Sequence, residues 1–288
     1  MKLVLTPNPY RDKQFRVAQQ AAKILEEAGA EVSLCLPFDV DADFEIPEDI
    51  HFRNLNDEIR NADMLICFGG DGTILHSSKI ATAHNLPVLG VNIGTMGFIA
   101  ELEAGELELL KRIPTGNYKL ETRSMIDVTV SNSGKQLFHE TALNDAVVTK
   151  GAIARVIQIG ICCDDVEATS YSGDGVILCT PTGSTAYSMS AGGPIIEPSA
   201  KNLLITPICA HDMLAKSIVV GPKRVITVRV GKIGRHNAFL SVDGGRAFRL
   251  SPGDVITARN SDKVTRLVRL KDTSFFEILN KKFLENKR

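Results

Sequence analysis

The sequence predicts two domains of different classes, a parallel α/β domain followed by an antiparallel all-β domain. The first hundred residues alternate short apolar runs with segments of helical periodicity, which is the pattern of a parallel sheet covered by helices. After about residue 122 the chain changes to many short β-branched runs separated by glycine or polar turns. That change indicates an antiparallel sandwich or a barrel-like domain.

The α/β domain is expected to span residues 1–122. Its strands are expected at residues 3–6, 31–36, 64–68 and 86–91, and its helices at residues 14–28 and 74–84. Glycine-rich turns at residues 69–73 and 94–97 follow two of these strands. They should therefore lie at the carboxyl edge of the sheet, where open α/β folds bind ligands.

The all-β domain is expected to span residues 123–264. Its strands are expected at residues 126–130, 146–149, 156–162, 175–180, 225–230 and 239–242. A helical pattern reappears at residues 275–284. We expect this last segment, residues 265–288, to return to the first domain.

Net charge and cysteine spacing indicate which binding partners and which cellular compartment to expect. The net charge of −1 creates no broad field, so we expect neither a nucleic-acid nor a membrane partner. The short apolar run at the N-terminus is broken by Pro7, which fits a first strand and not a signal peptide. No stretch approaches membrane-spanning length. The cysteines lack C-x-x-C spacing, and we expect buried thiols in a reducing cytoplasm at Cys35, Cys67, Cys162, Cys163, Cys179 and Cys209.

The turn Gly69-Gly70-Asp71-Gly72-Thr73 is the first chemical signal. Its glycines allow the backbone to approach a ligand, and the amides of the following helix offer a phosphate site. A carboxylate there repels phosphate unless it accepts a proton from a hydroxyl or holds a divalent metal ion, so Asp71 is the candidate catalytic residue. The alternative is that Asp71 only caps the helix.

Other phosphate and dinucleotide motifs are missing. The chain lacks both the P-loop pattern and the protein-kinase catalytic loop. The first strand is followed by Thr6-Pro7-Asn8-Pro9 where a dehydrogenase would carry G-x-G-x-x-G. If NAD binds to this chain, it therefore binds as a substrate.

Two further segments suit a nucleotide. Residues 172–175 and 180–194 are rich in glycines and small hydroxyl residues around Tyr187, which favours contacts with ribose, amide and phosphate groups. The alternative is an ordinary turn with Thr185 as a helix N-cap. Asn144 and Asp145 precede a strand, and an amide beside a carboxylate suits a ribose diol or an adenine edge. A common turn is the equally acceptable alternative.

Together these three elements resemble the NAD kinase family from residue 65 to residue 244. The glycine turn is shared with diacylglycerol kinases, sphingosine kinases and phosphofructokinases, whereas residues 174–194 are more specific. The resemblance implies a Rossmann-like N-terminal domain, a C-terminal β-sandwich domain, a site in the crevice between them, and assembly into homodimers or homotetramers. It also implies ATP or polyphosphate as donor, with Mg²⁺ or a similar ion for which no protein ligand is assigned.

The same resemblance implies roles for individual residues. Asp71 matches the acceptor of the ribose 2′-hydroxyl proton, with Gly72 beside it and Gly69, Gly70 and Thr73 completing the phosphate loop. Asn144 and Asp145 match the pair that holds NAD, where most relatives carry glutamate second. The other expected NAD-binding residues are His76, Phe98, Arg155, Ser172, Asp174, Thr182, Thr185, Ala186, Tyr187, Ser188, Ser190 and Gly245.

Some of these positions have particular features. Phe98 matches an aromatic residue on the adenine side, and Arg155 matches a basic or polar group near phosphates. His76 matches such a group too, with a surface or packing residue as its alternative. Ser172 stands where many relatives have arginine, and Gly245 where many have glutamine.

The predicted function is that of an NAD kinase, which phosphorylates the 2′-hydroxyl of the adenosine ribose of NAD with ATP or polyphosphate to give NADP. A lipid kinase of the diacylglycerol or sphingosine type is the alternative, but it requires an apolar slot, and residues 180–190 are polar and small. A non-catalytic NAD(P)-binding regulator would have lost its catalytic group, and Asp71 is present.

Overall fold

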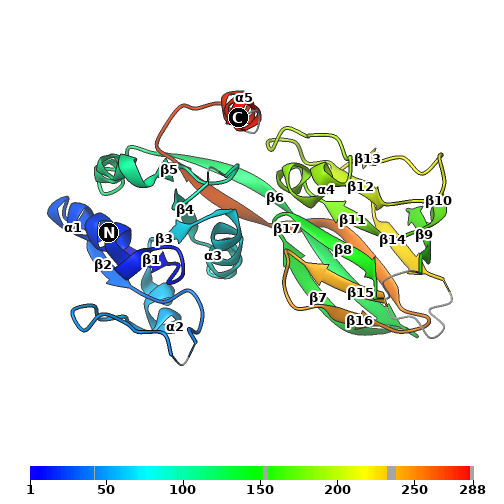
Figure 1. Ribbon diagram of the computed structural model, residues 1–288, viewed down its shortest axis with the longest axis horizontal. Helices are drawn as coiled ribbons and strands as arrows, with labels where there is room; N and C mark the ends of the chain where they lie inside the picture. The colour runs from blue at the N-terminus through cyan, green and yellow to red at the C-terminus, as the bar shows by residue number, and fades with distance from the viewer. Residues whose placement is uncertain (42, 96, 152–154, 232–237, 286–288) are drawn as a thin grey trace. The chain divides into compact units, whose positions relative to one another are not determined.

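The computed structural model describes residues 1–41, 43–95, 97–151, 155–231 and 238–285 (Figure 1). The chain forms two compact units, each with its own core. Unit 1 consists of Met1–Thr122 and Thr265–Arg288, and unit 2 consists of Arg123–Val264.

Unit 1 contains a parallel sheet in the order β2-β1-β3-β4. Its strands are β1 (Lys2–Pro7), β2 (Glu31–Leu34), β3 (Met64–Gly69) and β4 (Pro87–Asn92). Two further segments pair in parallel with β4, namely β5 (Leu102–Glu103) and the end of β17 (Val255–Arg269).

Helices cover both faces of this sheet, and β3 is therefore buried on both sides. Met64, Ile66 and Phe68 share a core with α1 (Arg16–Glu27) and η3 (Ala104–Arg112). Leu65 and Cys67 share another core with α3 (Asp71–Ala83). This arrangement confirms the expected parallel α/β class. The helices of unit 1 are η1 (Lys13–Phe15), α1 (Arg16–Glu27), α2 (Leu55–Glu58), η2 (Ile59–Asn61), α3 (Asp71–Ala83), η3 (Ala104–Arg112) and α5 (Phe275–Glu285).

Two helices begin at other residues than the periodicity predicts. Helix α1 begins at Arg16 because Gln14 and Phe15 adopt left-handed φ values of 54° and 55°, which interrupt the helix. Helix α3 begins at Asp71, three residues before the predicted start at Ile74, because helical dihedrals start directly after Gly70. Apolar periodicity does not detect such polar first turns.

Unit 2 is a sandwich of two sheets, and the strand pairs formed by its described residues are antiparallel. One sheet has the order β13-β12-β11-β8-β15-β16, and the other contains β10-β9-β14-β17 with β6 between β17 and β7. Val128 and Val228 from the second sheet share one core with Val148, Leu178 and Leu240 from the first. The β-sandwich is therefore confirmed, which decides between the two all-β architectures that the sequence allowed.

The strands of unit 2 are mostly short. They are β6 (Lys119–Asn132), β7 (Lys135–Ala142), β8 (Asp145–Lys150), β9 (Ile157–Cys163), β10 (Val166–Gly173), β11 (Gly175–Cys179), β12 (Leu203–Ile208), β13 (Ile218–Val220), β14 (Ile226–Val230), β15 (Ala238–Val242) and β16 (Phe248–Leu250). Two short helices follow β11, η4 (Thr182–Thr185) and α4 (Tyr187–Ser190).

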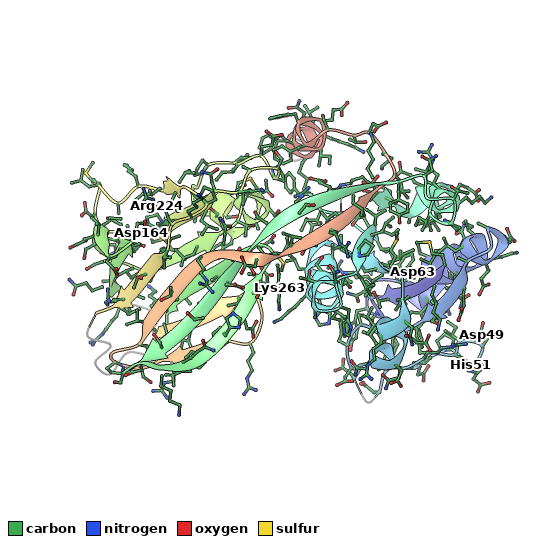
Figure 2. All side chains as sticks on the ribbon, turned by 180° about the vertical axis from the view of Figure 1, so that it is seen from behind. Asp49, His51, Asp63, Asp164, Arg224 and Lys263 are labelled. Carbon is green, nitrogen blue, oxygen red and sulfur yellow. The ribbon has the colours of Figure 1, made fainter. Side chains whose placement is uncertain are left out.

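Exposed aspartates connect strand ends in each unit. In unit 1 Asp63 accepts a hydrogen bond of 2.7 Å from the backbone N–H of Lys2, which joins the starts of β3 and β1. In unit 2 Asp164 accepts one of 2.9 Å from the N–H of Val225 and pairs with Arg224 at 2.5 Å (Figure 2). The turn between β9 and β10 is thus attached to the start of β14.

The expectation of buried thiols is correct for three cysteines and wrong for the others. Cys35, Cys67 and Cys179 are buried, and burial raises the pKa of each thiol to about 12. Cys162 and Cys163, at the end of β9, are only partly buried. Cys209 is exposed because β12 ends at Ile208.

No helix among the described residues is long and apolar enough to cross a membrane.

Candidate functional site

The two glycine-rich turns of unit 1 lie side by side at the carboxyl edge of the sheet. Gly69 at the end of β3 is the register partner of Asn92 at the end of β4. The N–H of Ile93 also donates a hydrogen bond of 3.1 Å to the carbonyl of Gly69. The adjacency of parallel strands therefore brings the two turns together.

Asp71 connects these turns. Its carboxylate accepts hydrogen bonds from the backbone N–H groups of Phe98, at 2.9 Å, and Ile99, at 3.3 Å. A Cβ on Gly97 would overlap this carboxylate. The N-cap of α3 is Gly70 and no side chain caps the helix, so the interpretation of Asp71 as a mere cap is wrong. Glycine at position 97 is what leaves space for the carboxylate.

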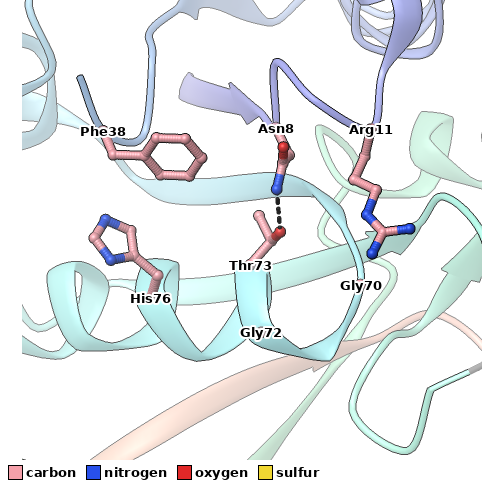
Figure 3. A pocket seen from close by; sticks show the side chains of 7 residues that line it. All are labelled: Asn8, Arg11, Phe38, Gly70, Gly72, Thr73 and His76. Atoms are coloured by element: carbon pink, nitrogen blue, oxygen red, sulfur yellow. Dashed lines mark hydrogen bonds between the residues drawn. The ribbon is translucent and has the colours of Figure 1, made fainter. Parts of the chain in front are cut away.

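A pocket of about 370 Å³ lies beside the first glycine turn (Figure 3). Phe38 and His76 lie at one end of it, and Arg11 lies beside Gly70 at the other. Within the described residues no hydrogen bond or ion pair engages the Arg11 guanidinium. The residues that line the pocket are Asn8, Arg11, Phe38, Gly70, Gly72, Thr73 and His76.

Sequence reasoning missed Asn8 and Arg11. Asn8 donates a hydrogen bond of 2.8 Å through Nδ2 to Oγ1 of Thr73, which fastens the turn after β1 to the first turn of α3. The parallel pairing of Pro7 with Phe68 places both turns at the same edge. The place of Asn8 directly after the first strand could have revealed it, because polar residues that follow a parallel strand lie at the carboxyl edge of the sheet.

The other predicted residues of unit 1 have protein partners as well. Nε2 of His76 lies 2.8 Å from the carbonyl oxygen of Pro37, and its ring packs edge-on against Phe38 at 5.8 Å. His76 thus has a packing role while it also lines the pocket. The Phe98 ring lies 6.0 Å from the ammonium group of Lys282 in α5.

Unit 2 presents Asn144 and Asp145 at the start of β8. Both residues are only 7% exposed. Within the described part of the chain, Oδ1 of Asn144 is buried without a hydrogen-bond partner. Burial raises the pKa of the Asp145 carboxyl to about 7, with a smaller contribution from the negative charge of Asp243. The pair therefore combines an unsatisfied acceptor with an acid that ionises near neutrality.

The hydroxyl-rich segment adjoins this pair. Thr180 donates a hydrogen bond of 2.9 Å from its N–H to the carbonyl of Asn144 and one of 2.5 Å from its hydroxyl to the carbonyl of Leu143. Gly183 has no space for a Cβ because the Asn144 carbonyl occupies it. The structure thus brings two of the three predicted elements together.

The positions around Tyr187 differ in exposure. Tyr187 is 47% exposed and available for stacking, whereas Ser188 is fully buried with its hydroxyl 2.7 Å from that of Thr206. Residues 182–185 do form a turn of 3₁₀ helix, as the alternative interpretation proposed. Helix α4 has no side-chain cap, so the assignment of Thr185 as its N-cap is wrong. Among the other predicted residues, Thr182 and Thr185 are buried, Ala186 is half-buried and Ser190 is exposed.

Asp174 does not join the Asn144 pair. It lies directly before β11 and forms an ion pair of 2.6 Å with Lys150. Asp145 is the register partner of Cys179 at the other end of β11, five residues from Asp174, so roughly 16 Å of strand separates the two aspartates. Two predicted residues also lie outside the Asn144 corner, with Ser172 exposed in β10 and Arg155 exposed before β9. Gly245 ends the β15–β16 turn, which adjoins the corner.

The described residues contain no group of three or more His, Cys, Asp or Glu side chains positioned to hold a metal ion. Mg²⁺ commonly takes one or two protein carboxylates and completes its shell with phosphate oxygens and water. Asp71 at the phosphate turn fits that donor set.

The chain matches family models over most of its length. The ATP-NAD kinase N-terminal domain matches residues 3–118, and the ATP-NAD kinase C-terminal domain matches residues 143–270. An NAD kinase from Caldanaerobacter subterraneus subsp. tengcongensis is 35% identical over 285 residues, 99% of each chain. One from Symbiobacterium thermophilum is 44% identical over 225 residues, which covers 76% of this chain and 78% of the relative.

Two solved structures resemble the fold. Yeast NADH kinase complexed with NADH matches with a TM-score of 0.84 at 25% identity, over 98% of this chain and 86% of that one. An NAD kinase from Archaeoglobus fulgidus in complex with ATP matches with a TM-score of 0.71 at 27% identity, over 98% of both chains.

Proposed function

The chain belongs to the NAD kinase family and transfers a phosphoryl group from ATP to NAD, and we propose that Asp71 accepts the proton of the ribose 2′-hydroxyl. The observation that carries this assignment is the orientation of its carboxylate. Two backbone N–H groups directly after the second glycine turn, those of Phe98 and Ile99, hold the carboxylate, and α3 does not use it as a cap. A carboxylate fixed at a phosphate turn is suited to general-base catalysis in phosphoryl transfer.

The donor half of the proposed machinery is the pocket beside Asp71. The first turn of α3 presents backbone N–H groups, and Arg11 adds a guanidinium group that favours phosphate oxygens. ATP fits this arrangement, and so does polyphosphate, because both present the same phosphate oxygens. The Gly69–Thr73 turn would hold a Mg²⁺ ion through these phosphates, and the ion would offset their negative charge.

The acceptor half is the proposed NAD site of unit 2. Asn144 offers the buried Oδ1 acceptor, Asp145 offers a carboxylate, and residues 174–190 offer hydroxyl and glycine surfaces. The lipid kinase alternative lacks support, because both matched domain families are ATP-NAD kinases. From the cysteine usage we propose a cytoplasmic location, and from the family resemblance a homodimer or homotetramer.

The Asp71→Asn variant tests the assigned base. The variant keeps the shape of the side chain but removes its basicity, so kcat should fall about a hundredfold or more while NAD and ATP still bind. NADP formation and the binding of both substrates are measured separately. Asp57→Asn, at an exposed carboxylate in the first turn of α2, is the control and should retain wild-type activity. Near wild-type kcat in Asp71→Asn would show that Asp71 is not the base.

A further inference from the structure

One carboxylate organises the corner that carries Asn144 and Asp145. Asp243 accepts hydrogen bonds from three consecutive backbone N–H groups, those of Leu143 at 2.7 Å, Asn144 at 2.8 Å and Asp145 at 3.0 Å. The N–H of Asp243 donates in return to the carbonyl of Asp145 at 2.9 Å. Hydrogen bonds to an ionised acceptor are about twice as strong as neutral ones. A single carboxylate therefore satisfies three consecutive backbone N–H groups of this corner.

Asp243 lies in the hairpin turn between β15 and β16. Asp243 and Gly244 both have positive φ values, 47° and 68°, and the N–H of Gly245 donates to the carbonyl of Val242 at 2.8 Å. Such two-residue turns favour an Asp-Gly pair. The register partner of Val242 is Ala146 in β8, so the turn places Asp243 opposite Asp145.

We propose that Asp243 is a positioning residue for NAD, because its carboxylate fixes the backbone that carries Asn144 and Asp145. The proposal rests on the proposed function of the Asn144–Asp145 pair in NAD binding. The buried Oδ1 of Asn144 supports a ligand at this corner, since an unpaired buried acceptor is costly unless a ligand hydroxyl or amine donates to it.

The burial and charges around Asp145 predict that NAD affinity depends on pH. Burial is the main cause that raises its pKa to about 7, and the negative Asp243 in the facing turn adds to it. Cys179, the register partner in β11, is a thiol whose pKa burial raises to about 12, so it stays neutral. Asp145 is therefore protonated below pH 7 and ionises as the pH rises through it. A carboxylate accepts a ribose hydroxyl better than the neutral acid does, so NAD affinity should increase over that interval.

The variant Asp243→Asn keeps the size of the side chain and tolerates the left-handed backbone. It removes the charge and turns one acceptor atom into an NH₂ group, which leaves a backbone N–H of the corner without its acceptor. At about pH 8 we expect the Kd for NAD, from isothermal titration calorimetry, to rise roughly tenfold or more, with kcat within about threefold of wild type. The midpoint of the affinity–pH profile should move below that of the wild type because the like charge is gone, while burial keeps it above the usual aspartate range.

Asp254→Asn is the matched control. Asp254 is another buried carboxylate of unit 2, and it accepts hydrogen bonds from the N–H of Ser251 at 2.7 Å and from Nδ2 of Asn132 at 2.8 Å, away from the NAD residues. Its variant should lose thermal stability but keep the wild-type Kd and midpoint. Equal effects of the two variants on Kd would reduce Asp243 to a general structural role and overturn the proposal.

The remaining outcomes distinguish failure of the NAD-binding assignment of Asn144 and Asp145 from failure of the positioning role of Asp243. If Asp145→Asn leaves NAD affinity unchanged, the assignment of the pair fails and the positioning role with it. If Asp145→Asn weakens NAD binding but Asp243→Asn keeps the wild-type Kd and midpoint, only the positioning role fails. Should Asp243→Asn not fold, Asp243→Ser takes its place, because its hydroxyl oxygen can still accept one backbone N–H of the corner, and a folded variant with the wild-type Kd for NAD overturns the proposal.

Discussion

A single methyl group at Gly97 should disable the proposed base. In the structure a Cβ on this residue would lie 2.5 Å from Cγ and 2.8 Å from Oδ2 of Asp71, and closer still to Oδ1. The φ of Gly97 lies outside the left-handed region, so alanine meets no backbone penalty there. The effect of Gly97→Ala is therefore steric, and it acts on the Asp71 carboxylate.

The expected size of the effect follows from the contacts that are lost. To make space, the carboxylate must move by about 1 Å or rotate away from the N–H groups of Phe98 and Ile99. A displacement of this size in a reacting group costs about a hundredfold in rate, which is about 2.7 kcal/mol of barrier. Overpacking at a tight site costs a further ~1–3 kcal/mol of stability. We therefore expect kcat to fall about a hundredfold and the Tm to fall by several degrees.

Initial rates of NADP formation with both substrates saturating, together with a thermal unfolding curve, measure both effects. Gly105→Ala is the matched control, because Gly105 lies in η3 of the same unit with open space around its Cα and no positive φ. That variant should retain both kcat and Tm. A folded Gly97→Ala protein with kcat within about threefold of wild type would refute the role of the Asp71 orientation in catalysis.

Two more predictions concern the pocket and the acidic pair. Arg11→Gln should raise the KM for ATP about tenfold or more and leave the KM for NAD unchanged, since a charge-assisted hydrogen bond to phosphate is worth ~2 kcal/mol; steady-state kinetics with each substrate varied would contradict this if both KM values stayed constant. Asp145→Asn should stabilise the fold at about pH 8 but not at about pH 4. In the unfolded chain Asp145 ionises near the ordinary aspartate pKa of 3.8, and in the folded chain only near 7. Wild-type stability therefore falls across this interval by ~1.4 kcal/mol per pH unit, whereas the variant does not titrate. Melting temperatures across this pH range measure the difference, and a constant difference would contradict the raised pKa.

Local pattern was sufficient for the fold classes and for the chemistry of the individual motifs. Alternating periodicities predicted a parallel α/β fold and a β domain, because a buried strand and an amphipathic helix each leave a local signature. The glycine turn after residue 68 and the hydroxyl-rich segment around Tyr187 were also readable, since the residue types alone indicate phosphate and ribose contacts. Sequence pattern alone therefore identified the family and nominated the candidate residues.

Which of these side chains and backbone groups come into contact depends on the three-dimensional fold. Asp71 and Phe98 are 27 residues apart, yet the pairing of β3 with β4 brings one carboxylate to the other turn. Asp243 and Asn144 are 99 residues apart and meet because the register of β15 on β8 places a two-residue turn against that corner. The same register separates Asp174 from Asp145 by the length of β11. Strand register depends on how both faces of each sheet pack, and no local periodicity contains that information.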